Sequence, residues 1–202
     1  TLQDGKGKIL ARDRHLLSLK DLDLSAHLAG LIDAGIDSFK IEGRLKDEGY
    51  VKNVTAYYRQ ALDKIIDADA GLLCSSSGRC NYSFVPDTAK SFNRGKTDYF
   101  LLHKRNTPGA LDSPKSIGQE LGRVVQSGRG VFTLATSEKV NNGDGLCFFA
   151  SDGELTGIKV NRVDGGKIYL RDAMVVAVGT LVYRNADTAF AKLLVKSDQC
   201  RS

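Results

Sequence analysis

Apolar residues in the first third of the chain recur at helical spacing in two segments, with a short extended segment between them. Residues 28–32 carry the first apolar stripe, which stops at Gly35 and predicts an amphipathic helix with a glycine just after its end. From about Asp47, apolar residues return at helical spacing through residues 51–65, which predicts a second, longer helix. Between the helices, a short buried strand is expected to run out into a loop within residues 38–44. The order helix, strand, helix indicates a parallel sheet.

Three charged side chains, Lys40, Glu42 and Arg44, lie where this strand is expected to become a loop. In parallel sheets, the loop that leaves the carboxyl end of a strand displays the reacting groups. We therefore predict that these residues are catalytic: the arginine can hold a carboxylate or phosphate through two hydrogen bonds, and the glutamate can orient or deprotonate a bound group. The alternative is a solvated strand end where Glu42 and Arg44 pair, which stabilises by about 0–1 kcal/mol.

The pattern changes to strands from Gly118 onward. Short runs rich in β-branched and aromatic residues alternate with turns such as Asn-Gly-Asp-Gly at residues 142–145. Close-set strands of this kind suggest a small antiparallel barrel, because closure leaves no edge strand open to other chains. The expected strands are Leu121–Val125, Val131–Ala135, Leu146–Phe149, Leu155–Val163, Lys167–Leu170 and Thr180–Tyr183.

This barrel, from about Gly118 to Arg184, is expected to bind or to scaffold, because it carries no paired carboxylates, metal-ligand cluster or phosphate loop. A short helix after Asp187 is expected to close it. The turn before the third strand resembles the glycine-aspartate turn of translation-factor-type barrels, which dock on RNA or protein. The expected core residues are Leu146, Phe148, Ile158, Val160 and Val182.

Apolar periodicity fades in the segment between the two regions, which is punctuated by glycine, serine and proline. Cys74 and Cys80 fall here with five residues between them, a spacing that matches none of the common zinc patterns, and the nearest histidine is His103. We expect free thiols and no metal site. The predicted class is α+β, with an incomplete α/β unit over residues 1–70, a connector over 71–117 and the barrel with its closing helix over 118–202.

The net charge of +5 is unevenly distributed. Residues 1–70 contain 11 Lys and Arg against 12 Asp and Glu, and subtraction from the totals of 29 and 24 leaves 18 against 12 for residues 71–202. Residues 71–202 therefore carry the whole excess of positive charge, so this part of the chain can attract a polyanion such as a nucleic acid. The chain contains no run near the ~20 apolar residues that span a bilayer, and no leader segment opens it, so we expect a cytoplasmic location and no membrane partner.

Several cations of the second part surround aromatic residues, a mixture that suits single-stranded nucleic acids because cations contact phosphates and rings stack on bases. We predict that Arg94, Lys96 and Tyr99 bind RNA. The alternative is a solvated basic face. The other members of this group are Lys90, Phe92, Phe100, Lys104 and Arg105.

Two blocks of sequence resemble peptidase family U32, whose members are called collagenase-like proteases. The first contains lysine-isoleucine-glutamate-glycine-arginine at residues 40–44, and the second, Phe-Asn-Arg-Gly at residues 92–95, is similar to the family's downstream phenylalanine-x-arginine-glycine element. The resemblance implies that the first region is the end of a TIM-like barrel, which takes about eight strands and ~250 residues and is incomplete here. The other resembling segments are residues 16–22, 31–39, 45–46, 57–63, Thr97 and 99–100.

The resemblance also implies a function. The C-terminal part is similar to that of longer members, which include enzymes that hydroxylate a cytidine of large-subunit ribosomal RNA and relatives that act on a transfer RNA uridine. In several relatives, cysteines upstream of the matching region hold an iron–sulfur cluster. Because the chain starts at Thr1 and its only methionine is Met174, we interpret it as part of a longer protein. We expect no cofactor in this part, an iron–sulfur cluster in the whole protein, and ribosomal or transfer RNA as the partner.

Two alternatives to RNA modification stay open. Proteolysis is the first, although His15, His27 and His103 lie near no glycine-flanked serine or cysteine that a base could activate. The second is a module that only binds RNA or protein. On either catalytic interpretation the chain alone is expected to be inactive, because the rest of the barrel orients the substrate.

Overall fold

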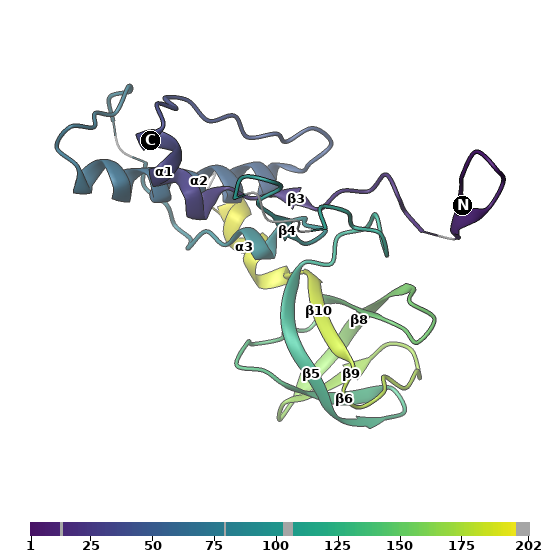
Figure 1. Ribbon diagram of the computed structural model, residues 1–202. Coiled ribbons are helices and arrows are strands. Elements are labelled where there is room, and N and C mark those ends of the chain that lie inside the picture. The colour runs from purple at the N-terminus through teal and green to yellow at the C-terminus, as the bar shows by residue number, and fades with distance from the viewer. Residues whose placement is uncertain (13, 79, 103–106, 197–202) are drawn as a thin grey trace.

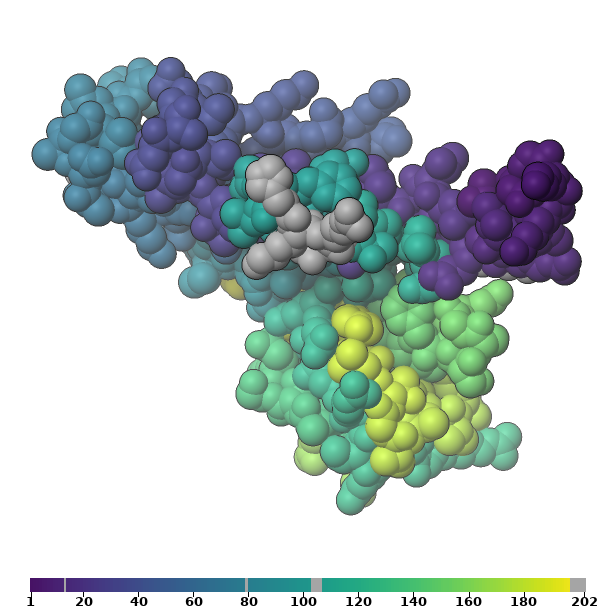
Figure 2. Space-filling model, in the orientation of Figure 1, coloured from purple at the N-terminus to yellow at the C-terminus, as the bar shows by residue number. Residues whose placement is uncertain are grey.

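The computed structural model describes residues 1–12, 14–78, 80–102 and 107–196, which form two regions (Figure 1). An elongated α/β region, drawn mostly in purple and blue, lies above a β-barrel drawn mostly in green and yellow. The space-filling view shows the same division, with the α/β region spread across the top of the molecule (Figure 2). The α+β class and the small antiparallel barrel expected from the sequence are confirmed.

Two helices form where the apolar spacing predicts them. α1 (Leu28–Asp33) ends just before Gly35, whose φ of 88° belongs to the left-handed region that glycine adopts without strain. α2 (Glu48–Ala68) begins after Asp47, whose carboxylate accepts a 2.7 Å hydrogen bond from the backbone N–H of Tyr50. This cap satisfies one of the N–H groups that a helix leaves unpaired at its start, so α2 begins where the sequence predicts it.

The strand expected within residues 38–44 does not form. The parallel pairing of this region joins β3 (Asp21–Leu22) to β4 (Lys96–Thr97), and β4 comes from the connector. A strand persists only where a neighbour satisfies its N–H and C=O groups, and no described strand pairs with residues 38–44, which remain an irregular loop. The other short elements are β1 (Leu2–Gln3), β2 (Ile9–Ala11), η1 (Ser25–His27) and η2 (Thr88–Lys90).

Six antiparallel strands form the second region. They are β5 (Gln119–Gly128), β6 (Val131–Ala135), β7 (Gly145–Phe149), β8 (Leu155–Asp164), β9 (Lys167–Leu170) and β10 (Leu181–Ala186). They close into a barrel, as predicted, and the strand order is β10-β5-β6-β9-β8-β7. The strands approach closely at Gly122, where a Cβ would lie 2.1 Å from the carbonyl oxygen of Ala135, so only glycine fits this position.

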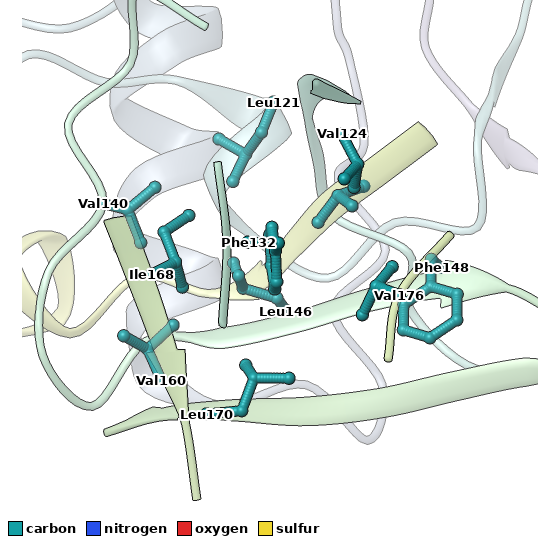
Figure 3. Close-up of a cluster of buried hydrophobic side chains, with 11 residues drawn as sticks. Leu121, Val124, Phe132, Val140, Leu146, Phe148, Val160, Ile168, Leu170 and Val176 are labelled. Carbon is teal, nitrogen blue, oxygen red and sulfur yellow. The ribbon is translucent and has the colours of Figure 1, made fainter. Parts of the chain in front are cut away.

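The barrel interior holds the main hydrophobic core (Figure 3). Ile158, which was also expected there, packs against this cluster but is only partly buried. Phe132 on β6 is the largest of the fully buried side chains. The predicted core residues that the structure buries are Leu146, Phe148, Val160 and Val182.

A buried ion cluster joins the barrel to the rest of the chain. The helix expected after Asp187 is present as α3 (Thr188–Lys196), but it packs against α2 and does not close the barrel as expected. The guanidinium of Arg184, whose side chain is 2% exposed, lies 3.2 Å from the Asp187 carboxylate and 3.6 Å from that of Asp144. Lys90 of the connector lies 3.7 Å from Asp187. Because a buried charge without its partner is strongly destabilising, this cluster holds the barrel, α3 and the connector together.

Candidate functional site

A cavity of about 520 Å³ lies between the loop of residues 38–44, β3 and α2. The three predicted catalytic residues, Lys40, Glu42 and Arg44, all line it. Arg94, one of the predicted RNA contacts, lines it as well. The remaining lining residues are Asp21, Leu22, Leu24, Leu28, Ser38, Phe39, Ile41, Lys46, Tyr50, Val54 and Tyr58.

The loop residues Lys40, Glu42 and Arg44 are exposed. One carboxylate oxygen of Glu42 accepts a 2.9 Å hydrogen bond from the backbone N–H of Arg44, and the other lies 3.9 Å from Nζ of Lys40. The side chains of Glu42 and Arg44 do not pair, and within the described part of the chain the Arg44 guanidinium has no carboxylate within ion-pair distance. The arginine is therefore available to an anionic ligand.

Arg94 is held by Asp21 of β3. Its backbone N–H donates a 2.7 Å hydrogen bond to the Asp21 carboxylate, and its guanidinium donates another of 3.1 Å to the second oxygen. Both side chains are about a quarter exposed. The predicted RNA contact thus has a carboxylate partner already, and its main role in this structure is to fasten the connector to β3.

Lys96 has a similar partner in Asp23. The ammonium lies 2.9 Å from the Asp23 carboxylate, which also accepts a 2.9 Å hydrogen bond from the hydroxyl of Tyr58 and one from the N–H of Ser25. Burial raises the pKa of Asp23, but the hydrogen bonds from Lys96 and Ser25 outweigh it and lower the pKa to about 2. Burial and the Asp23 carboxylate raise the pKa of Tyr58 well above its usual value, so this phenol stays protonated.

Lys46 extends the positive charge of the cavity. Its ammonium lies 3.3 Å from the ring centroid of Phe92 and 5.7 Å from that of Tyr50, a cation–π arrangement. Burial lowers the pKa of Lys46, and the neighbouring Arg94 lowers it further. Burial also raises the pKa of the Tyr50 phenol, with Asp21 acting in the same direction.

Tyr99, the third predicted RNA contact, does not line this cavity. Its ring packs edge-on against Phe100, with centroids 4.6 Å apart, and it is 44% exposed. Its φ of 57° is unusual for a residue with a side chain, and its N–H donates to the Thr97 hydroxyl. Lys104 and Arg105, the other cations predicted here, lie outside the described residues.

Sequence reasoning missed the Asp21 carboxylate and the phenols of this site. Asp21 follows the apolar run Leu16–Leu19, a signal of a strand end comparable to that of Glu42 and Arg44. Tyr50 and Tyr58 belong to α2, where their helical spacing favours an interpretation as packing residues. Only the folded chain shows that they face the same cavity.

The cavity combines cations, carboxylates and phenols on partly apolar walls, which is typical of a site that binds a polar, planar and anionic ligand. Neither a cysteine nor a histidine is among its described lining residues. A nucleophile paired with a histidine base is thus not assembled in this part of the chain.

The described cysteines do not form a metal site. Cys74 and Cys80 are exposed free thiols, while Cys147 is buried in the barrel. Among the described residues, no three His, Cys, Asp or Glu side chains are grouped so that they can hold a metal ion. The described helices include none with the length and apolarity needed to cross a bilayer.

Some relatives of this chain are named for RNA hydroxylation and others for proteolysis. The chain is 48% identical over 164 residues to the 23S rRNA 5-hydroxycytidine C2501 synthase of Escherichia coli, and this match covers 81% of the chain and 25% of the relative. It is 47% identical over 53 residues to tRNA hydroxylation protein P2 of Bacillus subtilis, covering 26% of this chain and 17% of the relative. A Porphyromonas gingivalis protein named collagenase is 26% identical over 179 residues, covering 87% of this chain and 41% of the relative.

The chain therefore spans about a quarter of the length of its Escherichia coli relative. No solved structure matches it. The model of peptidase family U32 matches residues 1–110, which is more than half of the chain and includes every residue that lines the cavity. This chain belongs to peptidase family U32.

Proposed function

We propose that the protein containing this chain hydroxylates a pyrimidine of ribosomal RNA. The observation that carries the proposal is the 48% identity, over 81% of the chain, to an enzyme named for 5-hydroxycytidine synthesis in 23S rRNA. The names of the shorter matches to tRNA hydroxylation proteins support RNA as the substrate class. A ribosomal substrate would place the protein in the cytoplasm.

The cavity supports this proposal through its chemistry. An enzyme that modifies an RNA base must take the base out of its stack and hold it by its polar edge and ring faces. Tyr50 and Phe39 offer ring surface, Arg44 offers two parallel hydrogen bonds to a phosphate, and Glu42 can orient or deprotonate the bound group. The volume of about 520 Å³ lies within the range of small-molecule sites.

An iron–sulfur cluster is part of the proposal for the whole protein only. Such a cluster would supply electron-transfer chemistry, and it takes four ligands, commonly cysteine thiolates. The described residues do not fit it, because Cys147 is buried in the barrel, away from the two exposed thiols of the connector. The part played by Glu42 and Arg44 is therefore argued without a cluster.

The test is complementation of an Escherichia coli strain that lacks its 23S rRNA 5-hydroxycytidine synthase. The full-length protein should restore 5-hydroxycytidine, measured by mass spectrometry of ribosomal RNA nucleosides. Glu42→Gln and Arg44→Ala should each abolish the product, because both side chains line the cavity and are exposed to a ligand. Lys64→Ala, on the same helix as Tyr58 but outside the cavity, is the matched control and should restore the product fully.

Proteolysis is the second candidate, favoured by the 26% identity to a protein named collagenase over 87% of the chain. The absence of histidine and cysteine from the described lining of the cavity weighs against it. Casein or gelatin degradation by the purified full-length protein that disappears in Glu42→Gln, with no 5-hydroxycytidine restored, would favour proteolysis over hydroxylation.

A further inference from the structure

A second cavity, of about 220 Å³, lies on the barrel where β5, β6 and β9 pair. Phe132 points into the barrel core, so the neighbouring side chains of Val131 and Thr133 on β6 point outward. Across the ladder, Tyr169 faces Val131 and Lys167 faces Thr133. These side chains form an outward-facing wall, far along the chain from the cavity near Glu42.

One hydroxyl group on this outward-facing wall has no partner. Oγ1 of Thr133 is buried and makes no hydrogen bond with any described residue. Folded proteins rarely leave a buried polar group unpaired, so this hydroxyl favours a polar ligand. Gln126, which faces Thr133 across the β5–β6 ladder, adds an exposed amide with both donors and an acceptor.

The same wall offers ring surface and positive charge. The guanidinium carbon of Arg162 lies 4.3 Å from the ring centroid of Tyr169, so the two groups are stacked. Lys167 and Arg162 are both exposed. Gly128 keeps the cavity open beside Val131, since a Cβ at Gly128 would approach a Val131 methyl group to 3.3 Å.

We infer that this cavity binds one base of a single-stranded RNA segment. The base would lie against Tyr169, its polar edge would pair with the Thr133 hydroxyl and the Gln126 amide, and the adjoining phosphates would lie near Lys167 and Arg162. Single-stranded nucleic acid sites combine aromatic stacking with cations that follow the backbone, and both are present here. The hydroxyl, the amide and the cations favour a base over an apolar peptide. The identity of the ligand as RNA rests on the proposed function.

The chain contains no tryptophan, which allows a direct test with the full 202-residue chain. Tyr169→Trp places the only indole in the cavity, and its fluorescence should be quenched when oligocytidylate is added, because the base stacks on it. Tyr183→Trp is the matched control: Tyr183 belongs to β10 of the same barrel, is also partly buried and does not line the cavity. Its fluorescence should not respond.

Affinity for the same oligocytidylate, measured by fluorescence anisotropy of a labelled strand, gives the second readout. Tyr169→Ala should weaken binding about 5- to 150-fold, the range that corresponds to the loss of one stacked base. Tyr169→Phe keeps the ring and should bind like the native chain. Lys167→Ala should lower the slope of affinity against salt by about one unit, since one phosphate contact is lost.

Unchanged affinity in Tyr169→Ala, with no quenching in Tyr169→Trp, would overturn the inference and leave the cavity to a protein partner. Equal competition by double-stranded RNA would overturn it too, because a paired base cannot enter the cavity. The proposed function fails separately, because it is measured by 5-hydroxycytidine in the complemented strain, whereas this site is measured by oligocytidylate binding that depends on Tyr169. Binding at Tyr169 without complementation would refute the hydroxylase alone, and complementation without Tyr169-dependent binding would refute this site alone.

Discussion

In the barrel, every strand from β5 to β10 pairs with two neighbours, whereas the ladders of the α/β region are two or three residues long. The same contrast holds for side chains. The barrel buries one continuous apolar cluster, while the α/β region leaves Leu17 98% exposed and Leu45 96% exposed. The barrel is complete in itself. The α/β region displays its charged loop and its apolar residues on a surface that only contacts outside the described chain can cover.

The difference follows from how the two kinds of sheet are connected. Antiparallel strands can be joined by short hairpins, so one stretch of chain supplies all the partners that a small barrel needs. Parallel strands need long crossovers, and a segment such as residues 38–44 finds its partners far away in sequence. Four experiments test this contrast, from the largest expected effect to the smallest.

The first concerns activity. The 202-residue chain alone should neither hydroxylate ribosomal RNA nor cleave casein or collagen, because positioning of the substrate contributes ~7–11 kcal/mol to lowering a barrier and the chain spans only about a quarter of its Escherichia coli relative. Nucleoside mass spectrometry and a fluorescent casein assay would measure this. Turnover by the chain alone that disappears in Glu42→Ala would show that the α/β region forms a complete site without further strands.

The second compares the cores. Phe132→Ala should lower the free energy of unfolding of the barrel by about 3–5 kcal/mol, because it leaves a cavity in a closed core. Leu17→Ala, at an exposed residue, should change the free energy of unfolding by no more than about 0.5 kcal/mol. Urea unfolding followed by circular dichroism measures both. Similar losses in the two variants would mean that Leu17 is packed in solution.

The third concerns pH. The pKa of Asp23 is about 2 in the folded chain, below its ordinary value of 3.8, so the folded state binds this proton less readily than the unfolded state. The stabilisation, at most about 2 kcal/mol, is therefore present above about pH 4 and lost as the pH falls toward about 2. Urea titrations across this pH range should show that the free energy of unfolding falls. In Asp23→Asn, the free energy of unfolding should depend less on pH. An Asp23→Asn variant with the native pH dependence would contradict the prediction.

The fourth concerns the exposed loop. Glu42→Ala and Arg44→Ala should each change the free energy of unfolding by no more than about 0.5 kcal/mol, because both side chains are exposed and do not pair with each other. Thermal and urea unfolding of the chain would measure this. A loss above about 1 kcal/mol would show that the loop stabilises the α/β region and that loss of product in these variants has a structural cause.

The sequence alone determined the parts of this protein that depend on near neighbours. The alternating residues of segment 121–183 and the turns between them predicted all six barrel strands, and the apolar spacing from about Asp47 predicted α2. The sequence also placed Lys40, Glu42 and Arg44 in one loop, and the structure shows all three lining one cavity. Helix caps, hairpins and strand alternation act within a few residues, so local pattern is enough to find them.

Only the tertiary structure decided how distant segments meet. Arg94 and Asp21, which are 73 residues apart, form a hydrogen-bonded ion pair, and no local pattern announces such a pairing. The same holds for Tyr58, whose phenol donates a hydrogen bond to Asp23, 35 residues away in the chain. The strand expected within residues 38–44 failed for the same reason: strand formation depends on a partner that supplies N–H and C=O groups, and the sequence of one segment does not say whether that partner is present.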